Sequence, residues 1–263
     1  MKRPIGLAVA VLLASCGGPD VVDEEPVIEP EIESIRAEFG SPDNLSGTWA
    51  RSVVTSAESS APIVGRVGTT NTRIFLDHVV QQDGSIQVES LLCDMSVETS
   101  TNMASTVIPS AFISAVGRTT WRATIDAGRL HSPMTYTTMG LSEVSPEDSL
   151  PESGDDPRVL DPDGDGQPGM TIQVTGLAGG EMYFVQRSWR ELESTRVTGT
   201  TIDGTVSWDA TRVVLGATSR SLRNARPAVP TESPAENYFR MTRIADQSTC
   251  VEVAAQGPSL FSR

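Results

Sequence analysis

From Leu45 onward, hydrophobic and polar residues alternate in short runs that are separated by turn-forming residues. Alternation with a period of two indicates strands with one buried face, and runs recurring every ~8–12 residues are typical of antiparallel barrels and sandwiches. The expected strands are GTWARSVV, TRIFLDHVV, SIQVESLLC, TTWRATID, MTIQVT, EMYFVQRSW, TVSWDATRVVL and NYFRMTRI, and the expected tight turns are QDGS, DAGR, GLAGG and IDGT. The pattern therefore predicts one all-β domain over residues 45–263, either an antiparallel β-barrel or a β-sandwich.

Two stretches do not follow this alternating pattern. Residues 141–169 are rich in Asp, Glu, Pro, Ser and Gly, and residues 218–236 are polar with several arginines and prolines. Long connections inside a compact domain are usually functional or disordered. We expect both stretches to be surface loops.

The first residues form a different pattern. Lys2 and Arg3 precede an apolar run over residues 5–14, which is too short to span a bilayer of ~30 Å as a helix and is typical of a signal peptide. The run ends in LASC, which resembles the lipobox of bacterial lipoproteins. That resemblance implies lipidation of Cys16, removal of residues 1–15 and, because Gly17 rather than Asp follows, residence in the outer membrane or at the cell surface. The alternative is an ordinary secretory signal with a chance cysteine.

Residues 16–44 form an acidic, proline-rich linker. Residues 17–43 contain nine acidic residues, one arginine and four prolines, a composition that favours an extended spacer. At its end, Ile32, Ile35 and Phe39 have helical spacing, so we expect a short helix that packs against the domain.

The net charge narrows the range of partners. The full chain has a formal charge of −14, and removal of Lys2 and Arg3 with the signal peptide would bring it to −16. Such a surface repels phosphate backbones, so nucleic acid is not an expected partner, whereas divalent cations are attracted.

Two cysteines remain if Cys16 carries lipid. Cys93 and Cys250 both lie in strand-like contexts, SLLCDMSV and STCVEV, and an even pair in an oxidising compartment favours a disulfide. The alternative is two separate buried thiols.

The motif DPDGDGQPGM places Asp161, Asp163 and Asp165 on alternate positions with glycines between them. Counted from Asp161, the aspartates occupy positions 1, 3 and 5 of an EF-hand calcium loop, and Gly166 occupies position 6. In such a loop the backbone carbonyl at position 7, here that of Gln167, is also a ligand. Position 12 is Ile172 instead of a bidentate Glu, and a strand follows, so the loop is no EF-hand. It is similar to the DxDGDG loops of extracellular bacterial and thrombospondin-type calcium modules.

We therefore expect a structural Ca²⁺ at this loop. The candidates for a further carboxylate ligand are Asp155, Asp156 and Asp209. Closely packed carboxylates repel one another, which favours a cation between them. The alternative is a solvated acidic turn that binds nothing.

The motif LSGTWA resembles the GxW motif that opens the first strand of lipocalins and related calycin barrels, with Gly47 and Trp49 at the matching positions. In that family an arginine of the last strand stacks on this tryptophan, a role that Arg240 or Arg243 in NYFRMTRI could fill. The resemblance implies a barrel whose interior holds a small apolar molecule. The chain also resembles uncharacterised lipoproteins of predatory and soil Deltaproteobacteria, through its anchor, its DxDGDGxPG loop and its YFVQRS and FRMTRI strands.

No motif in the sequence supports catalysis. His78 and His131 lack zinc-binding spacing, and neither a GxSxG elbow nor a Walker loop is present. We therefore expect a non-enzymatic, lipid-anchored envelope protein that binds a small apolar ligand or a protein partner. The alternatives are a calcium-dependent hydrolase of the envelope or exterior and a structural or assembly lipoprotein without a ligand.

Overall fold

The computed structural model describes residues 35–37, 40–61, 65–142, 144–176 and 179–262. The signal segment 1–15, Cys16 and most of the linker 16–44 lie outside the described residues. The compact unit that holds the sheet spans Ser34–Arg263. Among the described helices, none is both long enough and apolar enough to cross a membrane.

The described part of the chain is mostly β-structure, as the sequence predicts. The strands are β1 (Gly47–Ala61), β2 (Gly65–Gln82), β3 (Ser85–Thr99), β4 (Ala104–Val107), β5 (Arg118–Asp126), β6 (Arg129–Met139), β7 (Met170–Gly176), β8 (Gly180–Val197), β9 (Thr201–Ala217), β10 (Val229–Pro230) and β11 (Tyr238–Arg243). The helices are α1 (Ser110–Val116), α2 (Arg220–Arg223), α3 (Cys250–Gln256) and the 3₁₀ helix η1 (Gly257–Phe261).

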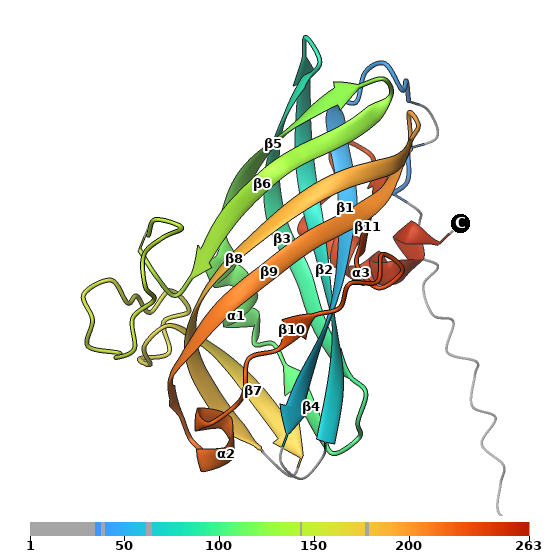
Figure 1. The fold of residues 1–263 in the computed structure, drawn as a ribbon. Helices are drawn as coiled ribbons and strands as arrows, with labels where there is room; N and C mark the ends of the chain where they lie inside the picture. The colour runs from blue at the N-terminus through green and yellow to red at the C-terminus, as the bar shows by residue number, and fades with distance from the viewer. Residues whose placement is uncertain (1–34, 38–39, 62–64, 143, 177–178, 263) are drawn as a thin grey trace, which may run out of the picture. The chain divides into compact units, whose positions relative to one another are not determined.

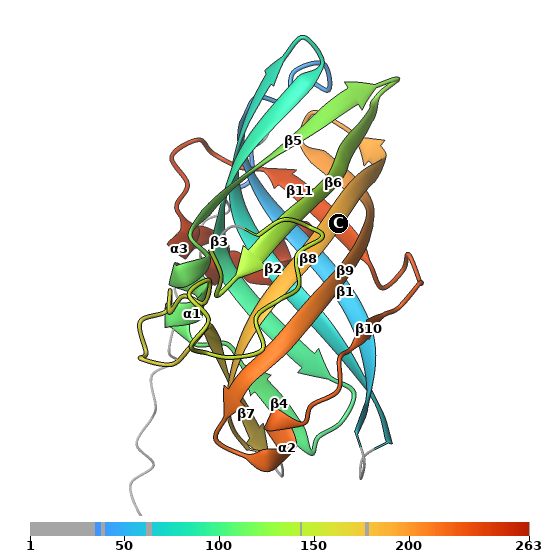
Figure 2. The same ribbon diagram turned by 60° about the vertical axis from the view of Figure 1, so that its left-hand side comes forward.

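Antiparallel pairing closes eight of these strands into a ring. The order is β1–β2–β3–β5–β6–β8–β9–β11, and β11 pairs with β1 again, so the all-β prediction is confirmed and, of the two expected architectures, the ring of pairings is that of a barrel. Figures 1 and 2 show long, tilted strands around a common interior. Where the ring is closed, these strands have no free edges, which antiparallel sheets otherwise have to protect.

The two ends of the barrel differ. At the end where β1 begins, which we call the Trp49 end, β5 and β6 complete the wall between β3 and β8. At the opposite end, which we call the cavity end, β4 and β7 take their place between the same two strands. Figure 1 shows β4, β7 and α2 together at this lower end.

The interior of the Trp49 end is a filled apolar core. Side chains from alternate positions of the ring strands pack there, among them Trp49, Val53, Phe75, Trp121, Leu192 and Phe239. Outside the wall, α3 and η1 cover a second cluster through Val253, Leu260 and Phe261. A third lies under the long loop, where Leu141 and Leu150 pack on Val185 of β8.

Most of the expected turns are hairpins in the structure. In QDGS and DAGR the two central residues have positive φ, at Asp83 (50°), Gly84 (76°), Ala127 (48°) and Gly128 (75°), which matches the twist of the flanking strands. The predicted turn IDGT is wrong, because these residues lie inside β9. A Cβ on Gly204 would come within 2.4 Å of the Phe239 ring, so this glycine admits a neighbouring aromatic ring and does not form a turn.

Strand β6 is not among the strands expected from the sequence. Its run RLHSPMTYTTM contains a proline, which normally argues against a strand within a sheet. The pairing of β6 with β8 is irregular between Ser132 and Thr135, and this bulge accommodates Pro133.

The disulfide between Cys93 and Cys250 is present, with the two Cα atoms 5.0 Å apart. The predicted strand context is right for Cys93, the extra residue of a bulge in β3, and wrong for Cys250, the first residue of α3. Thr249 and Glu252 form a capping box at the start of this helix. The bond fixes α3 against the outer face of the barrel.

The short helix expected before the domain is not seen in residues 35–37. Arg36 instead forms an antiparallel bridge with Ile244, and the Ala37 amide donates to the Arg243 carbonyl at 2.9 Å. Ile35 packs on the cluster under α3. These residues continue the sheet because the end of β11 offers free backbone groups to pair with.

Candidate functional site

The predicted metal residues Asp161, Asp163 and Asp165 lie together on the loop between β6 and β7. One carboxylate oxygen from each of the three lies within 4.8 Å of the others. The Asp161 carboxylate accepts hydrogen bonds from the amides of Gly164 (2.9 Å), Asp165 (3.2 Å) and Gly166 (2.9 Å). Gly164 and Gly166 have φ of 69° and 81°, so the tight curl depends on glycine.

The three carboxylates are not equally satisfied. Asp163 Oδ2 accepts from the Thr171 amide at 2.9 Å, while its Oδ1 is buried without a hydrogen-bond partner. Burial, assisted by the neighbouring Asp165 carboxylate, raises the pKa of Asp163. Gln167 lies in the same curl, and its backbone N–H donates to Asp165 Oδ1 at 2.8 Å. The donor set suits a hard cation such as Ca²⁺.

The candidates for a fourth carboxylate are not gathered with these three. Asp156 forms an ion pair with Arg158 at 2.8 Å, and hydrogen bonds from the Arg158 side chain and amide lower its pKa to about 2. Asp209 lies on β9 and accepts from the neighbouring Ala210 amide. Asp155 is exposed and is not part of the cluster.

Of the two arginines proposed for closing the barrel, Arg243 is the one that stacks on Trp49. Its guanidinium lies 4.8 Å from the centre of the Trp49 ring and donates to the carbonyls of Gly199, Ser46 and Asn44, each at 2.8 Å. A Cβ on Gly47 would lie 2.9 Å from Arg243 Nη1, so glycine makes room for this arginine. Arg240 instead pairs with Asp203 at 3.4 Å.

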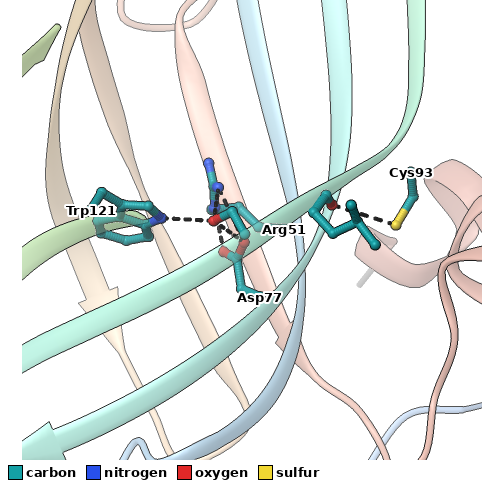
Figure 3. A network of polar contacts seen from close by, with 6 residues as sticks. Arg51, Asp77, Cys93 and Trp121 are labelled. Carbon is teal, nitrogen blue, oxygen red and sulfur yellow. Dashed lines mark hydrogen bonds and ion pairs between the residues drawn. The ribbon is translucent and has the colours of Figure 1, made fainter. Parts of the chain in front are cut away.

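Within the apolar core, the interior carries a buried ion pair that the sequence did not indicate. Arg51 Nε donates to Asp77 Oδ2 at 2.5 Å, and both side chains are fully buried. Ser90 Oγ donates to Asp77 Oδ1 at 2.6 Å and accepts from Arg51 Nη2 and Trp121 Nε1 (Figure 3). The Arg51 guanidinium also lies 4.2 Å from the centre of the Phe75 ring.

Three further arginines point inward near this pair. Arg73 on β2, Arg190 on β8 and Arg212 on β9 share the inward alternation of their strands. Burial lowers their pKa values to about 10, 9 and 10, and repulsion from neighbouring arginines contributes in each case. Asp77 acts in the opposite direction on Arg190, whereas among the described residues no carboxylate has this effect on Arg73 or Arg212.

These arginines form an interior cationic layer, which we define as Arg51, Arg73, Arg190 and Arg212. Its members differ in their partners. Arg212 donates twice to Gln186 Oε1, at 3.0 and 2.8 Å, and lies 4.4 Å from the centre of the Phe184 ring. Arg73 Nε is buried without a hydrogen-bond partner. Arg190 lies 5.9 Å from the centre of the Phe75 ring.

Below the cationic layer, the cavity end encloses a space of about 260 Å³. Arg73 and Arg212 line it, together with apolar side chains of β3, β7 and β8 and with Phe112 of α1. The wall is interrupted on one side, because β9 pairs with β11 only as far as Thr205 and β10 contributes just two residues to the sheet. Residues 225–228 lie across this interruption and line the cavity.

Asn237 secures the chain beside this opening. Its Oδ1 accepts from Trp208 Nε1 at 2.8 Å and from the Ser56 amide at 3.0 Å, and its Nδ2 donates to the carbonyls of Thr231 and Ser233. The segment 218–236, expected as a plain surface loop, is thus held at its end while residues 225–228 remain exposed.

The histidines stand apart from the interior. His78 is exposed on β2, 3.4 Å from Thr48 Oγ1, and His131 is exposed 3.8 Å from Glu191. Neither histidine lines the cavity of the barrel.

Comparison with protein-family models and with curated proteins finds no match for this chain.

Proposed function

We propose that this protein is a lipid-anchored envelope protein that binds a small molecule in the cavity end of its barrel. The observation that carries this proposal is the interior space of about 260 Å³, lined by eight strands, by helix α1 and by the crossing segment 225–228. A space of this size has room for several water molecules and suits a small ligand.

The two ends of the barrel support different tasks. The Trp49 end is filled with apolar side chains and sealed by Arg243, so it supplies rigidity. The cavity end has the incomplete wall between β9 and β1, which offers a route into the interior. A binding site supported by a rigid scaffold loses little free energy in becoming ordered on binding.

The aspartate loop has a supporting role in this proposal. A Ca²⁺ ion bound by Asp161, Asp163 and Asp165 would neutralise carboxylates that otherwise repel one another. Asp163 accepts a hydrogen bond from the backbone N–H of Thr171, the second residue of β7. The ion would therefore order the loop against a strand that lines the cavity.

Ligand binding is tested by isothermal titration calorimetry of decanoate into the full chain carrying Cys16→Ser, prepared without lipid or detergent. We expect saturable binding at one site. Ala210→Phe, whose side chain would enter the cavity, should weaken it by about tenfold or more. Thr211→Phe, on the exposed outer face of the same strand, is the matched control and should leave the affinity unchanged.

Absence of saturable binding, or equal affinity in the two variants, would overturn the proposed function. The melting temperatures of both variants are measured first, so that a loss of binding is attributed to the filled cavity and not to unfolding.

A further inference from the structure

The interior of the barrel has the opposite charge to the chain as a whole. The chain has a formal charge of −14, yet the cationic layer contains four arginines, compensated by the single carboxylate of Asp77. Of the other three arginines, Arg73 and Arg190 are half-buried, and Arg212 is accessible where it lines the cavity. Positive charges gathered in one interior repel one another, so an anion among them would lower the electrostatic free energy of the barrel.

Two arginines of the cationic layer line the cavity, Arg73 and Arg212. Arg51 is paired with Asp77 in the core, although its Nη1 is also buried without a hydrogen-bond partner. Arg73 lines the cavity and has a buried Nε without a partner. Arg212 lines the same space, and its hydrogen bonds with the described residues go to a neutral side-chain amide, that of Gln186. Guanidinium groups bind carboxylates and phosphates through paired N–H donors. An anion in the cavity would therefore supply hydrogen-bond acceptors and negative charge to both Arg73 and Arg212.

The rest of the lining is divided between polar and apolar sides. Small polar groups of β1 and β2 line one part: Thr55, Ser59, Thr69 and Asn71. Apolar groups line the other: Met95, Phe112, Ile172, Met182, Phe184 and Val214. Methionine and phenylalanine side chains adapt well to an irregular apolar surface. An occupant therefore meets a charged region and an apolar region within one small space.

Resting on the proposed function, we propose that the cavity binds a small amphipathic anion, with its acidic head group between Arg73 and Arg212 and its apolar body against Phe184 and the methionines. This revises the expectation of a purely apolar ligand, since a neutral apolar molecule would leave the guanidinium groups without partners. The exposed Arg226, which also lines the cavity, adds positive charge where the ligand would enter.

The test compares decanoate with decan-1-ol, which has the same chain length and no charge, by titration calorimetry of the same full-length Cys16→Ser protein. We expect decanoate to bind at least about tenfold more tightly, and Arg73→Met and Arg212→Met each to weaken decanoate by about tenfold to a hundredfold while changing decan-1-ol little. Arg122→Met, on the exposed face of β5, is the control and should change neither affinity.

The possible outcomes separate this inference from the proposed function. Equal affinity for the two ligands, or unchanged decanoate affinity in both arginine variants, overturns the anion proposal and leaves a neutral binding site. Binding of neither ligand overturns the proposed function itself. The melting temperature gives an independent readout, because removal of an uncompensated charge should not lower the stability of the unliganded protein, whereas loss of a structural residue should.

Discussion

Arg51 and Asp77 lie 26 residues apart in the sequence and are joined in the structure by two hydrogen bonds in a fully buried environment. The pair stabilises the fold only as long as both charges are present, because either charge alone would be buried without compensation. Alternation along β1 and β2 predicts that both residues share a face with Trp49 and Phe75. What alternation does not predict is that the two side chains meet, since this depends on the register between the strands.

Asp77→Asn should lower the free energy of unfolding by about 3–5 kcal/mol, because it leaves the Arg51 guanidinium buried without a counter-charge. The double variant Arg51→Met with Asp77→Leu should recover most of this loss, since two apolar side chains need no compensation. Urea denaturation monitored by tryptophan fluorescence measures both. A double variant as unstable as Asp77→Asn would contradict this account of the pair.

At the scale of a structural element, the long loop 141–169 combines a locally encoded curl with contacts to a distant strand. Its sequence predicts a loop, and the curl of Asp161 around the following amides is encoded within six residues. Its attachment to the barrel is not local. Leu141 and Leu150 pack on Val185, and Arg187 of β8 donates to the carbonyls of Ser145 and Asp148. The loop is thus fixed over the outer face of β8, and the carboxylate cluster with it.

Calcium should raise the melting temperature of the protein through this loop. For a site of the weak extracellular class, with a Kd of about 1 mM, 10 mM Ca²⁺ contributes about 1.4 kcal/mol, or roughly 3–6 °C in a domain of this size. Differential scanning calorimetry with Ca²⁺ and with a chelator measures the shift. Asp163→Asn should abolish it, and Glu152→Gln, an exposed residue of the same loop, should preserve it. A shift that survives in Asp163→Asn would place the ion elsewhere.

At the scale of the whole molecule, the barrel closes through contacts between distant parts of the chain. β11 pairs with β1, Arg243 covers Trp49, and the disulfide joins residues 157 positions apart. Crosslinks that close long loops restrict the unfolded chain most in the chain-entropy model. The C-terminal segment therefore seals the barrel.

The anchor is tested by cell fractionation. The protein with Cys16 should be found with the membranes, because two or more acyl chains hold a protein stably on a bilayer. Cys16→Ser should stop lipid attachment and lipobox processing, which mass spectrometry of the purified chain detects. Unchanged processing and an identical mass in this variant would contradict lipidation at Cys16 and, with it, the proposed location in the envelope.

The sequence by itself determined the local features of this protein: the period-two strands, the hairpin turns at Asp83–Gly84 and Ala127–Gly128, and the gathering of three aspartates, because each depends on interactions within a few residues. It also indicated the pairing of Cys93 with Cys250, since only two cysteines follow Cys16. The tertiary structure alone decided that the sheet closes, that Gly204 lies inside a strand beneath Phe239, and that four arginines from different strands share one interior. These outcomes depend on strand register and on contacts across the barrel, where the free energy is set by packing and by uncompensated charge and not by the preferences of neighbouring residues.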